Sequence, residues 1–414
     1  MKTPLLGCIA DDFTGATDLA SMLVRAGLNV IQCFGLPDDP ESLRDADAVV
    51  ISLKSRSIAS EDAVDVSRAA LRVLQELGVQ RYFFKYCSTF DSTPSGNIGP
   101  VADALANDLG NETTLFCPSF PENGRTVYCG HLFVHGIVLH ESGMRNHPLN
   151  PMTDGNLVRV LQAQSEREVT SWKLHDPPPN QTRQHVIVDA ITDEDLNRVA
   201  TAAKEHHFLT GGSAIAGHWG RILFEETRGD SERDASSAPL GGGRTVILAG
   251  SCSDATRTQI GAFATRYPVH RFNATTDSNA DELASRALDW CRDQWAQTSE
   301  VPLLICSGED AQSVKRAQQA MGVDASSRQI EHAFAAIARG LMDFRVQRIV
   351  VAGGETSGAV TSAIHIRVVR IGSEIAPGVP WITSIHPPHL TLALKSGNFG
   401  GPRFFLEVTE APDE

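Results

Sequence analysis

The sequence predicts an α/β protein of two domains, each with a mainly parallel sheet flanked by helices. Short β-branched runs alternate with longer stretches of helical periodicity, which is the order of successive β-α-β units. One polar, glycine-rich stretch without periodicity, RGDSERDASSAPLGGG at 228–243, interrupts this alternation. Such a composition is typical of a domain boundary. We therefore assign residues 1–230 to a first domain, 231–243 to a linker and 244–414 to a second domain.

The composition is that of an ordinary globular protein. Of its 414 residues, 42% are hydrophobic and 21% are charged, and the net charge of −14 disfavours nucleic acid and anionic membranes as partners. No apolar run is long enough to span a bilayer, and the N-terminal run is too short for a signal peptide. The 8 cysteines form no C-x-x-C pair, so we expect reduced thiols, a cytoplasmic location and no zinc or redox motif.

The first β-α-β unit places two carboxylates at a strand end. A strand at 5–10 is followed by Asp11 and Asp12, and then by a helical apolar stripe at 16–24 and a second strand at 30–34. Ligands of parallel sheets bind beyond the carboxyl ends of the strands. One carboxylate there is explained as a helix cap, but two exceed what capping needs. We therefore expect at least one of them to bind a substrate hydroxyl or to remove its proton.

The next two strands end in basic residues. Arg56 follows the strand at 48–53, and Lys85 lies at the end of the strand at 81–86, beside a loop rich in hydroxyls and glycine at 87–100. A cation in such a position can pair with a substrate carboxylate. For Lys85 the sequence leaves a second interpretation open, in which it is a solubilising lysine on an edge strand.

The remainder of the first domain adds two strands, at 114–120 and 186–189, and Thr192 is a good cap for the helix that follows them. The stretch at 135–154 contains three histidines, but their spacing does not match that of a zinc site, so we expect no metal there. We expect this stretch to form a long ordered excursion over the site.

The second domain has small polar residues at three strand ends, at 250–254, 307–310 and 353–358. If the strands are parallel, these residues line one edge of one sheet. The last of them belongs to RIVVAGGETSGAV at 348–360, a strand, a glycine turn and a helix start. Glycines let the backbone approach an anion, and the free N–H groups of a helix start point at it. The stretch has Ala359 in place of a Walker lysine, and an ordinary strand-to-helix turn is the alternative.

A last strand at 390–394 leads into a second glycine-rich element, KSGNFGG at 395–401. Lys395 is placed to neutralise phosphate charge, although a solvated loop lysine is an equally good interpretation. Carboxylates and cations in one domain and phosphate-binding loops in the other favour phosphoryl transfer from a nucleotide to a small hydroxylated acid. We expect the active site in the cleft between the domains, with Mg²⁺ bridging the phosphates and domain closure excluding water.

Five motifs together resemble the four-carbon acid sugar kinase family over nearly the whole chain. They are IADDFTGATD at 9–18, FKYCSTFDST at 84–93, GNIGP at 96–100, VAGGETSG at 351–358 and ALKSGNFG at 393–400. The resemblance implies an ATP-dependent kinase for the terminal hydroxyl of 3-oxo (3-dehydro) four-carbon sugar acids. It also implies that the first domain binds the sugar acid and the second binds ATP.

The resemblance also implies roles for individual residues. The family's ATP-binding positions correspond to Ser251, Gly353, Gly354, Glu355, Thr356 and Gly397. The candidates for substrate binding are Asp11, Asp12, Arg56 and Lys85. Among these, Asp12 is expected to be the catalytic base or a hydroxyl ligand, and Arg56 or Lys85 to bind the carboxylate. One departure is Arg403, which stands where the family has an acidic residue.

Several alternatives remain open from the sequence. Within the family, the substrate could instead be D-threonate or D-erythronate. A dinucleotide-dependent oxidoreductase is disfavoured, because the first strand lacks G-x-G-x-x-G after it and its acidic end would repel a pyrophosphate. A non-catalytic ligand-sensing module is a third interpretation. The sequence fixes no metal ligands, and it leaves a homodimer possible.

Overall fold

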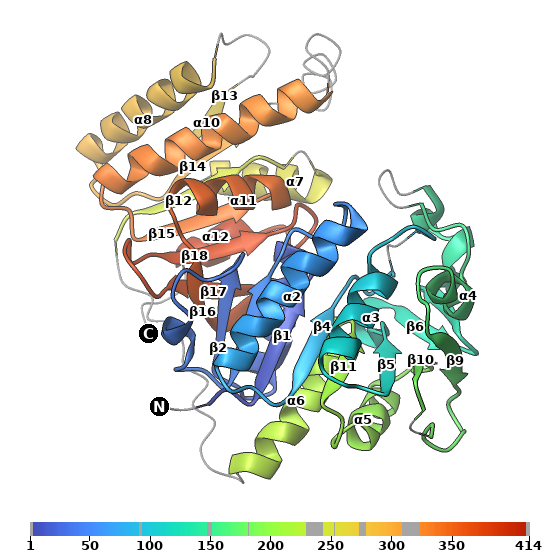
Figure 1. Cartoon of the computed structure of the whole chain (residues 1–414). Helices are drawn as coiled ribbons and strands as arrows, with labels where there is room; N and C mark the ends of the chain where they lie inside the picture. Colours follow the sequence, from blue (N-terminus) through green and yellow to red (C-terminus); the bar gives the residue numbers. More distant parts are fainter. Residues whose placement is uncertain are drawn as a thin grey trace. The chain divides into compact units, whose positions relative to one another are not determined.

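The computed structural model describes residues 3–90, 93–146, 151–180, 182–228, 243–251, 253–272, 279–308 and 323–410. The chain divides into two compact units, Met1–Ala235 and Ser236–Glu414. Each unit is a mainly parallel sheet flanked by helices, as predicted from the sequence (Figure 1). The predicted linker at 231–243 lies outside the described residues except for Gly243, so its limits stay a prediction. Within the described residues, no helix is both long and apolar enough to cross a membrane.

The sheet of the first unit is parallel throughout, in the order β2-β3-β1-β4-β11-β5-β10-β9. Its strands are β1 (Leu6–Ala10), β2 (Val30–Phe34), β3 (Ala48–Ser52), β4 (Tyr82–Lys85), β5 (Thr113–Cys117), β9 (Glu168–Trp172), β10 (Gln184–Val188) and β11 (Phe208–Gly211). Most of their residues are buried, because helices cover both faces of the sheet.

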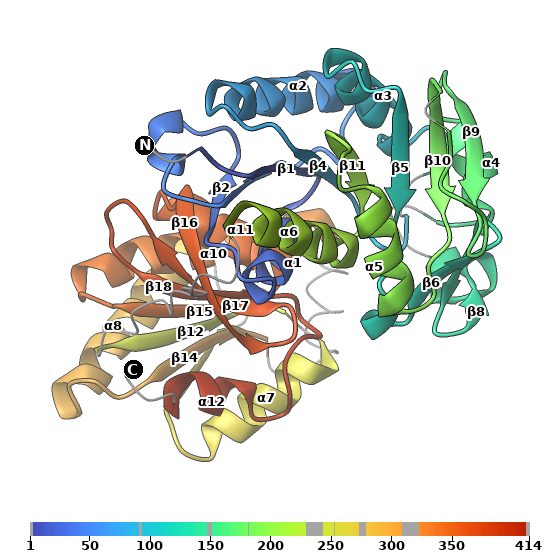
Figure 2. The ribbon, with the colours of Figure 1, turned by 90° about the horizontal axis from the view of Figure 1, so that it is seen from below.

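The helices of the first unit form two layers (Figure 2). One layer contains α1 (Phe13–Arg25), α5 (Asp193–Ala202) and α6 (Ser213–Arg228), and the other contains α2 (Ser60–Glu76) and α3 (Ile98–Asp108). Shorter helices are α4 (Leu157–Gln162), η1 (Pro40–Leu43), η2 (Pro121–Asn123), η3 (Leu139–Glu141) and η4 (Gly143–Asn146). Thr192 caps α5, as predicted, through a capping box with Asp195.

The excursion predicted at 135–154 belongs to a longer insertion that starts earlier. It begins with a small antiparallel sheet of β6 (Arg125–Tyr128), β7 (His131–Val134) and β8 (Ile137–Val138). The carboxylate of Asp189 anchors this sheet, because it accepts hydrogen bonds from the N–H groups of Cys129 (2.6 Å) and Gly130 (2.9 Å).

The sheet of the second unit has the order β13-β14-β12-β15-β18-β17-β16. Its parallel part comprises β12 (Thr245–Ala249), β13 (Val269–Phe272), β14 (Leu303–Ser307), β15 (Arg348–Ala352) and β18 (Thr391–Lys395). An antiparallel extension, β16 (Val368–Ala376) and β17 (Val379–Ser384), was not predicted from the sequence.

Helices also cover both faces of this second sheet. On one face lie α8 (Ala280–Gln297), α10 (Val323–Asp343) and α11 (Gly354–Ala363), and on the other α7 (Asp254–Ala264) and α12 (Phe404–Glu410) (Figures 1 and 2). The core beneath α7 and α12 contains Phe263, Phe404 and Phe405, which are fully buried against β12, β15 and β18. These aromatic rings fix both helices against the sheet.

Candidate functional site

Three neighbouring strands of the first unit end at the same level. Ala10 of β1 pairs with Ser52 of β3 on one side and with Lys85 of β4 on the other. The chain leaves β1 for strands on one side of it and later returns to the other side, which makes β1 a topological switch point. Ligands of parallel sheets bind at such points. The structure therefore brings Asp11, Asp12, Arg56 and Lys85 to one edge, as the sequence predicted.

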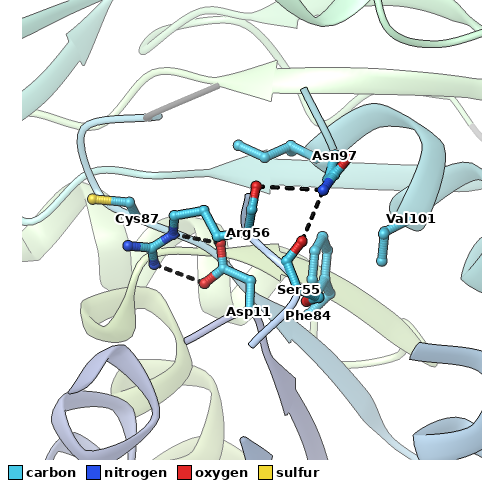
Figure 3. Close-up of a pocket in the computed structure, with 8 residues that line it drawn as sticks. Asp11, Ser55, Arg56, Phe84, Cys87, Asn97 and Val101 are labelled. Carbon is cyan, nitrogen blue, oxygen red and sulfur yellow. Dashed lines mark hydrogen bonds and ion pairs between the residues drawn. The ribbon is translucent and has the colours of Figure 1, made fainter. Parts of the chain in front are cut away.

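Arg56 joins the two aspartates. Its Nε and Nη2 atoms lie 2.9 Å and 2.8 Å from the two carboxylate oxygens of Asp11 (Figure 3). Nη2 also lies 2.6 Å from Oδ1 of Asp12. Asp11 is only 6% exposed, whereas the side chain of Asp12 is 30% exposed. Burial raises the pKa of Asp11, and the Arg56 guanidinium opposes part of that rise. Asp12 is thus the carboxylate of the pair that a ligand can reach.

Asp12 has a second partner. Its Oδ1 accepts a hydrogen bond from the N–H of Gly15 (3.1 Å), so Asp12 also caps α1. A side chain at Gly15 would overlap this oxygen and would bring a Cβ within 3.1 Å of Nζ of Lys85. Capping and ligand binding are compatible here, because a carboxylate has two oxygens and about four acceptor positions.

Lys85 is not an edge residue, and that interpretation of the sequence is wrong. Its strand β4 lies between β1 and β11, and Lys85 is 3% exposed. Its Nζ donates to the carbonyl oxygen of Tyr86 (2.9 Å). A buried cation in a central strand requires compensation, and the charges of Asp11 and Asp18 supply it.

Sequence reasoning missed two further polar residues close to this edge. Asp18 of α1 accepts a hydrogen bond from the hydroxyl of Ser213, the first residue of α6. Burial raises the pKa of Asp18, and the charge of Lys85 opposes that rise. Helical spacing was the signal that could have found Asp18. It lies three residues after Gly15 and three before the buried Ser21, so it shares their side of α1.

Asn97 of the GNIGP motif was also missed as an individual residue. Its Nδ2 lies 2.8 Å from the carbonyl oxygen of Ser55, 3.3 Å from that of Arg56 and 2.9 Å from that of Ile58. This amide therefore holds the turn that carries Arg56 (Figure 3). A small pocket beside the turn is lined by Asp11, Ser55, Arg56, Phe84, Cys87, Asn97, Ile98 and Val101.

In the second unit, three strand ends are joined by backbone hydrogen bonds. The N–H groups of Gly250 and Ser251, which follow β12, donate to the carbonyl of Ala352 at the end of β15 (3.0 and 3.1 Å). The N–H of Gly353 donates to the carbonyl of Lys395 at the end of β18 (2.9 Å). The polar residues predicted at 250–254, 307–308 and 353–358 do line one edge, because β14, β12 and β15 are parallel neighbours. Cys252 and residues 309–310 lie outside the described part.

The predicted nucleotide residues meet at this edge. A Cβ at Gly353 would lie 3.1 Å from Oγ1 of Thr356 and 3.3 Å from the backbone N of Ser251, and a Cβ at Gly397 would overlap Oγ of Ser251. Gly354 is exposed in the first turn of α11, as is Glu355, where helix N–H groups have no intrahelical acceptor. Thr356 is buried, and its hydroxyl lies beside Gly250 and Gly353.

Lys395 is not a solvated loop lysine, and that interpretation is also wrong. The residue is 2% exposed, and burial lowers its pKa to about 8. Its Nζ donates to the carbonyl oxygens of Gly397 (3.1 Å) and Ser396 (3.2 Å) and to Oγ1 of Thr256 (3.3 Å).

Comparisons with known proteins agree with this division of sites. Residues 6–219 match a family model described as a sugar-binding N-terminal domain, and residues 246–405 match one described as a nucleotide-binding C-terminal domain. The chain is 44% identical over 423 residues to the 3-oxo-tetronate kinase of Burkholderia multivorans, covering 99% of this chain and 98% of that protein. The chain belongs to the four-carbon acid sugar kinase family.

Other members of this family are similarly close. The 3-oxo-tetronate kinase of Pseudomonas savastanoi is 46% identical over 421 residues, covering 98% of this chain and 96% of that protein. The crystal structure of a Haemophilus influenzae protein superposes with a TM-score of 0.84 at 36% identity and covers 98% of this chain and 99% of that one. Arg403, the departure from the family pattern, is exposed just before α12, where a charged residue of either sign is accommodated.

Proposed function

We propose that this protein is an ATP-dependent kinase that phosphorylates the 4-hydroxyl of 3-oxo-tetronate (3-dehydro-L-erythronate or 3-dehydro-D-erythronate). The observation that carries the proposal is the partly exposed Asp12 carboxylate, held by Arg56 at the switch point of the sugar-binding domain. Support for the substrate comes from the names of relatives that are 44–46% identical over nearly the whole chain.

The proposed chemistry assigns separate tasks to the residues of the first site. Asp12 accepts the proton of the 4-hydroxyl as that oxygen attacks the γ-phosphorus of ATP; the bond from this phosphorus to the β–γ bridging oxygen breaks, and ADP leaves. The ion pair with Arg56 keeps the Asp12 carboxylate in a fixed position. Nη1 of Arg56, which makes no hydrogen bond to the described residues, or Nζ of Lys85 binds the substrate carboxylate.

The second site is proposed to bind ATP through Ser251, Gly353, Gly354, Glu355, Thr356 and Gly397. Within the described residues, no group of three His, Cys, Asp or Glu side chains is placed to hold a metal ion. Mg²⁺ would arrive with the nucleotide, and Glu355, which is exposed in the first turn of α11, is the carboxylate of this site that would contact it. Bound Mg²⁺ would neutralise charge on the phosphates. Phosphoryl transfer requires the sugar acid and the nucleotide to be bound next to each other. The cleft predicted from the sequence therefore remains part of the proposal.

A substrate panel tests the reaction. We expect 3-oxo-tetronate to be consumed only with ATP, giving ADP and a 4-phosphate detectable by ³¹P NMR. Turnover with D-threonate and D-erythronate should be at least about tenfold slower, because their C3 hydroxyl adds an O–H donor that a site for a C3 carbonyl leaves unpaired. Phosphorylation of threonate with the 3-oxo acids inert would instead establish the alternative substrate. Thermal stabilisation by NAD but not by ATP would favour the oxidoreductase.

We also propose a cytoplasmic location. The cysteines that the structure describes, Cys8, Cys33, Cys87, Cys117, Cys129, Cys291 and Cys306, are all free thiols, which suits a reducing compartment. A homodimer stays a prediction, which sedimentation analysis can decide.

A further inference from the structure

The first turns of α7 present polar side chains on one face. Ser253 caps the helix, and Thr256 and Gln259 follow at intervals of three residues, so the three lie along one side of α7. Thr256 is 0% exposed and Gln259 is 1% exposed. Buried polar side chains need hydrogen-bond partners, and these residues find theirs in the loop that follows β18.

One backbone oxygen of that loop receives three donors. The carbonyl of Gly397 accepts hydrogen bonds from Oγ of Ser253 (2.7 Å), from Oγ1 of Thr256 (2.8 Å) and from Nζ of Lys395 (3.1 Å). A carbonyl oxygen has two lone pairs, so this acceptor is saturated. Its peptide plane is therefore fixed against α7.

Gln259 fixes the rest of the loop. Its Nε2 lies 3.0 Å from each of the carbonyl oxygens of Phe399, Gly400 and Gly401. The loop is rich in glycine, and a backbone hydrogen bond from the N–H of Phe399 to the carbonyl oxygen of Ser396 (3.2 Å) closes a turn within it. One buried amide group thus holds the carbonyl groups of three successive residues toward α7.

These contacts determine where the peptide N–H groups of the loop point. The C=O and N–H of a planar trans peptide point in opposite directions. With the carbonyl groups turned toward α7, the N–H groups of Asn398, Gly400 and Gly401 are turned away from it. Backbone N–H groups presented by a glycine-rich loop are the usual means of holding phosphate. The loop also abuts the nucleotide edge, since Gly397 lies against Ser251.

Lys395 adds a positive charge beneath the loop. Within the described residues no carboxylate lies within ion-pair distance of its Nζ; the groups that face it are the Thr256 hydroxyl, two loop carbonyls and the rings of Phe404 (6.0 Å) and Phe405 (5.7 Å). None of these groups is titratable. A buried cation without a counter-ion is costly alone and is stabilised when an anion binds nearby.

We propose that Thr256, Gln259 and Lys395 are positioning residues that hold the loop at 396–401 in its phosphate-binding conformation and supply the charge that a nucleotide's phosphates pair with. This inference rests on the proposed function for its ligand, a nucleoside di- or triphosphate. It adds residues that act through the loop backbone and are separate from those assigned to ATP contact above.

Thr256→Val tests the hydrogen-bonding part, because valine keeps the shape and removes the hydroxyl. We expect the dissociation constant for ADP, measured by calorimetry on the full chain, to rise about fivefold to tenfold. The KM for the sugar acid should change less than about twofold. Thr256→Ser should restore wild-type affinity. Thr258→Val is the matched control, since Thr258 is exposed on the same helix and, among the residues that the structure describes, its hydroxyl bonds only the carbonyl of Asp254.

Lys395→Met tests the charge through a pH profile. Lys395 has a pKa of about 8, so it loses its proton as the pH rises through that value, and the wild-type affinity for ADP should fall with it. We expect a loss of about tenfold between pH 7 and pH 9.5 in the wild type. The methionine variant should bind weakly and equally at both pH values, because no proton is lost there.

The outcomes separate the two proposals. Wild-type ADP affinity in Thr256→Val, or a pH dependence retained in Lys395→Met, would overturn the positioning role while leaving the kinase assignment intact. ADP binding that follows both expectations, together with no turnover on any four-carbon acid, would overturn the assigned reaction and keep the positioning role. Thermal melting of each variant shows that it is folded, and the Thr256→Ser rescue distinguishes a lost hydroxyl from general damage.

Discussion

Replacement of Asp12 by asparagine is expected to lower kcat by about 10² to 10⁴, the usual contribution of a general base, while the affinity for ATP changes less than about twofold. Asparagine is as good a helix cap as aspartate, so the bond from the Gly15 N–H and the start of α1 are retained. Arg56 also stays in place, because Asp11 holds it through two hydrogen bonds of 2.9 and 2.8 Å. The substitution thus removes one carboxylate charge and little else. Steady-state kinetics, with the sugar acid and ATP varied in turn, measures kcat separately from the KM for each substrate.

The matched control is Asp39→Asn. Asp39 is another aspartate cap, which accepts from the N–H of Glu41 (3.1 Å) at the start of η1 and is exposed in the segment between β2 and β3. It should leave both kcat and KM unchanged. Near wild-type turnover in Asp12→Asn would show that Asp12 serves only to cap α1 and to orient Arg56.

Sequence reasoning predicted those site residues that directly follow a strand in the chain. Strands, and the polar residues just beyond them, are local features, and parallel pairing then brings Asp12 and Arg56 together without further information. The interpretation of Lys85 could not be settled this way. Whether β4 is an edge or a central strand depends on its pairing with β11, whose residues lie more than a hundred positions later.

Asn97 and Gln259 share a role that sequence reasoning missed. Each donates to several backbone carbonyls of a distant loop, and Gln259 reaches carbonyls 140 to 142 residues away. Carbonyl groups carry no sequence signal, so a side chain that binds only carbonyls has no partner visible in the sequence. The strands β16 and β17 were missed for a different reason. Charged residues such as Arg370 and Glu374 interrupt the apolar pattern of β16, so no strand was predicted there.

Replacement of Gly353 by alanine is expected to raise the dissociation constant for ADP at least about tenfold, with the KM for the sugar acid unchanged. Gly353 has φ of 124° and joins β15 to α11, and only glycine adopts this conformation without strain. The new Cβ would also lie 3.1 Å from Oγ1 of Thr356 and 3.3 Å from the backbone N of Ser251. The loop must shift to relieve both, and the N–H groups at the start of α11 shift with it. Calorimetry with ADP measures the loss.

Gly110→Ala separates backbone strain from damage to the site. Gly110 also has positive φ, at 62°, but it is exposed after α3, and a Cβ there would meet nothing within 4 Å. We expect it to lower the melting temperature, since alanine is strained at positive φ, and to leave ADP affinity unchanged. If Gly353→Ala binds ADP as well as Gly110→Ala does, the glycine turn is only a connection between strand and helix. If ADP affinity falls in Gly353→Ala alone, the loss comes from the turn at Gly353 and not from positive-φ strain in general, because Gly110→Ala introduces such strain at an exposed position. The turn at Gly353 then contributes to phosphate binding.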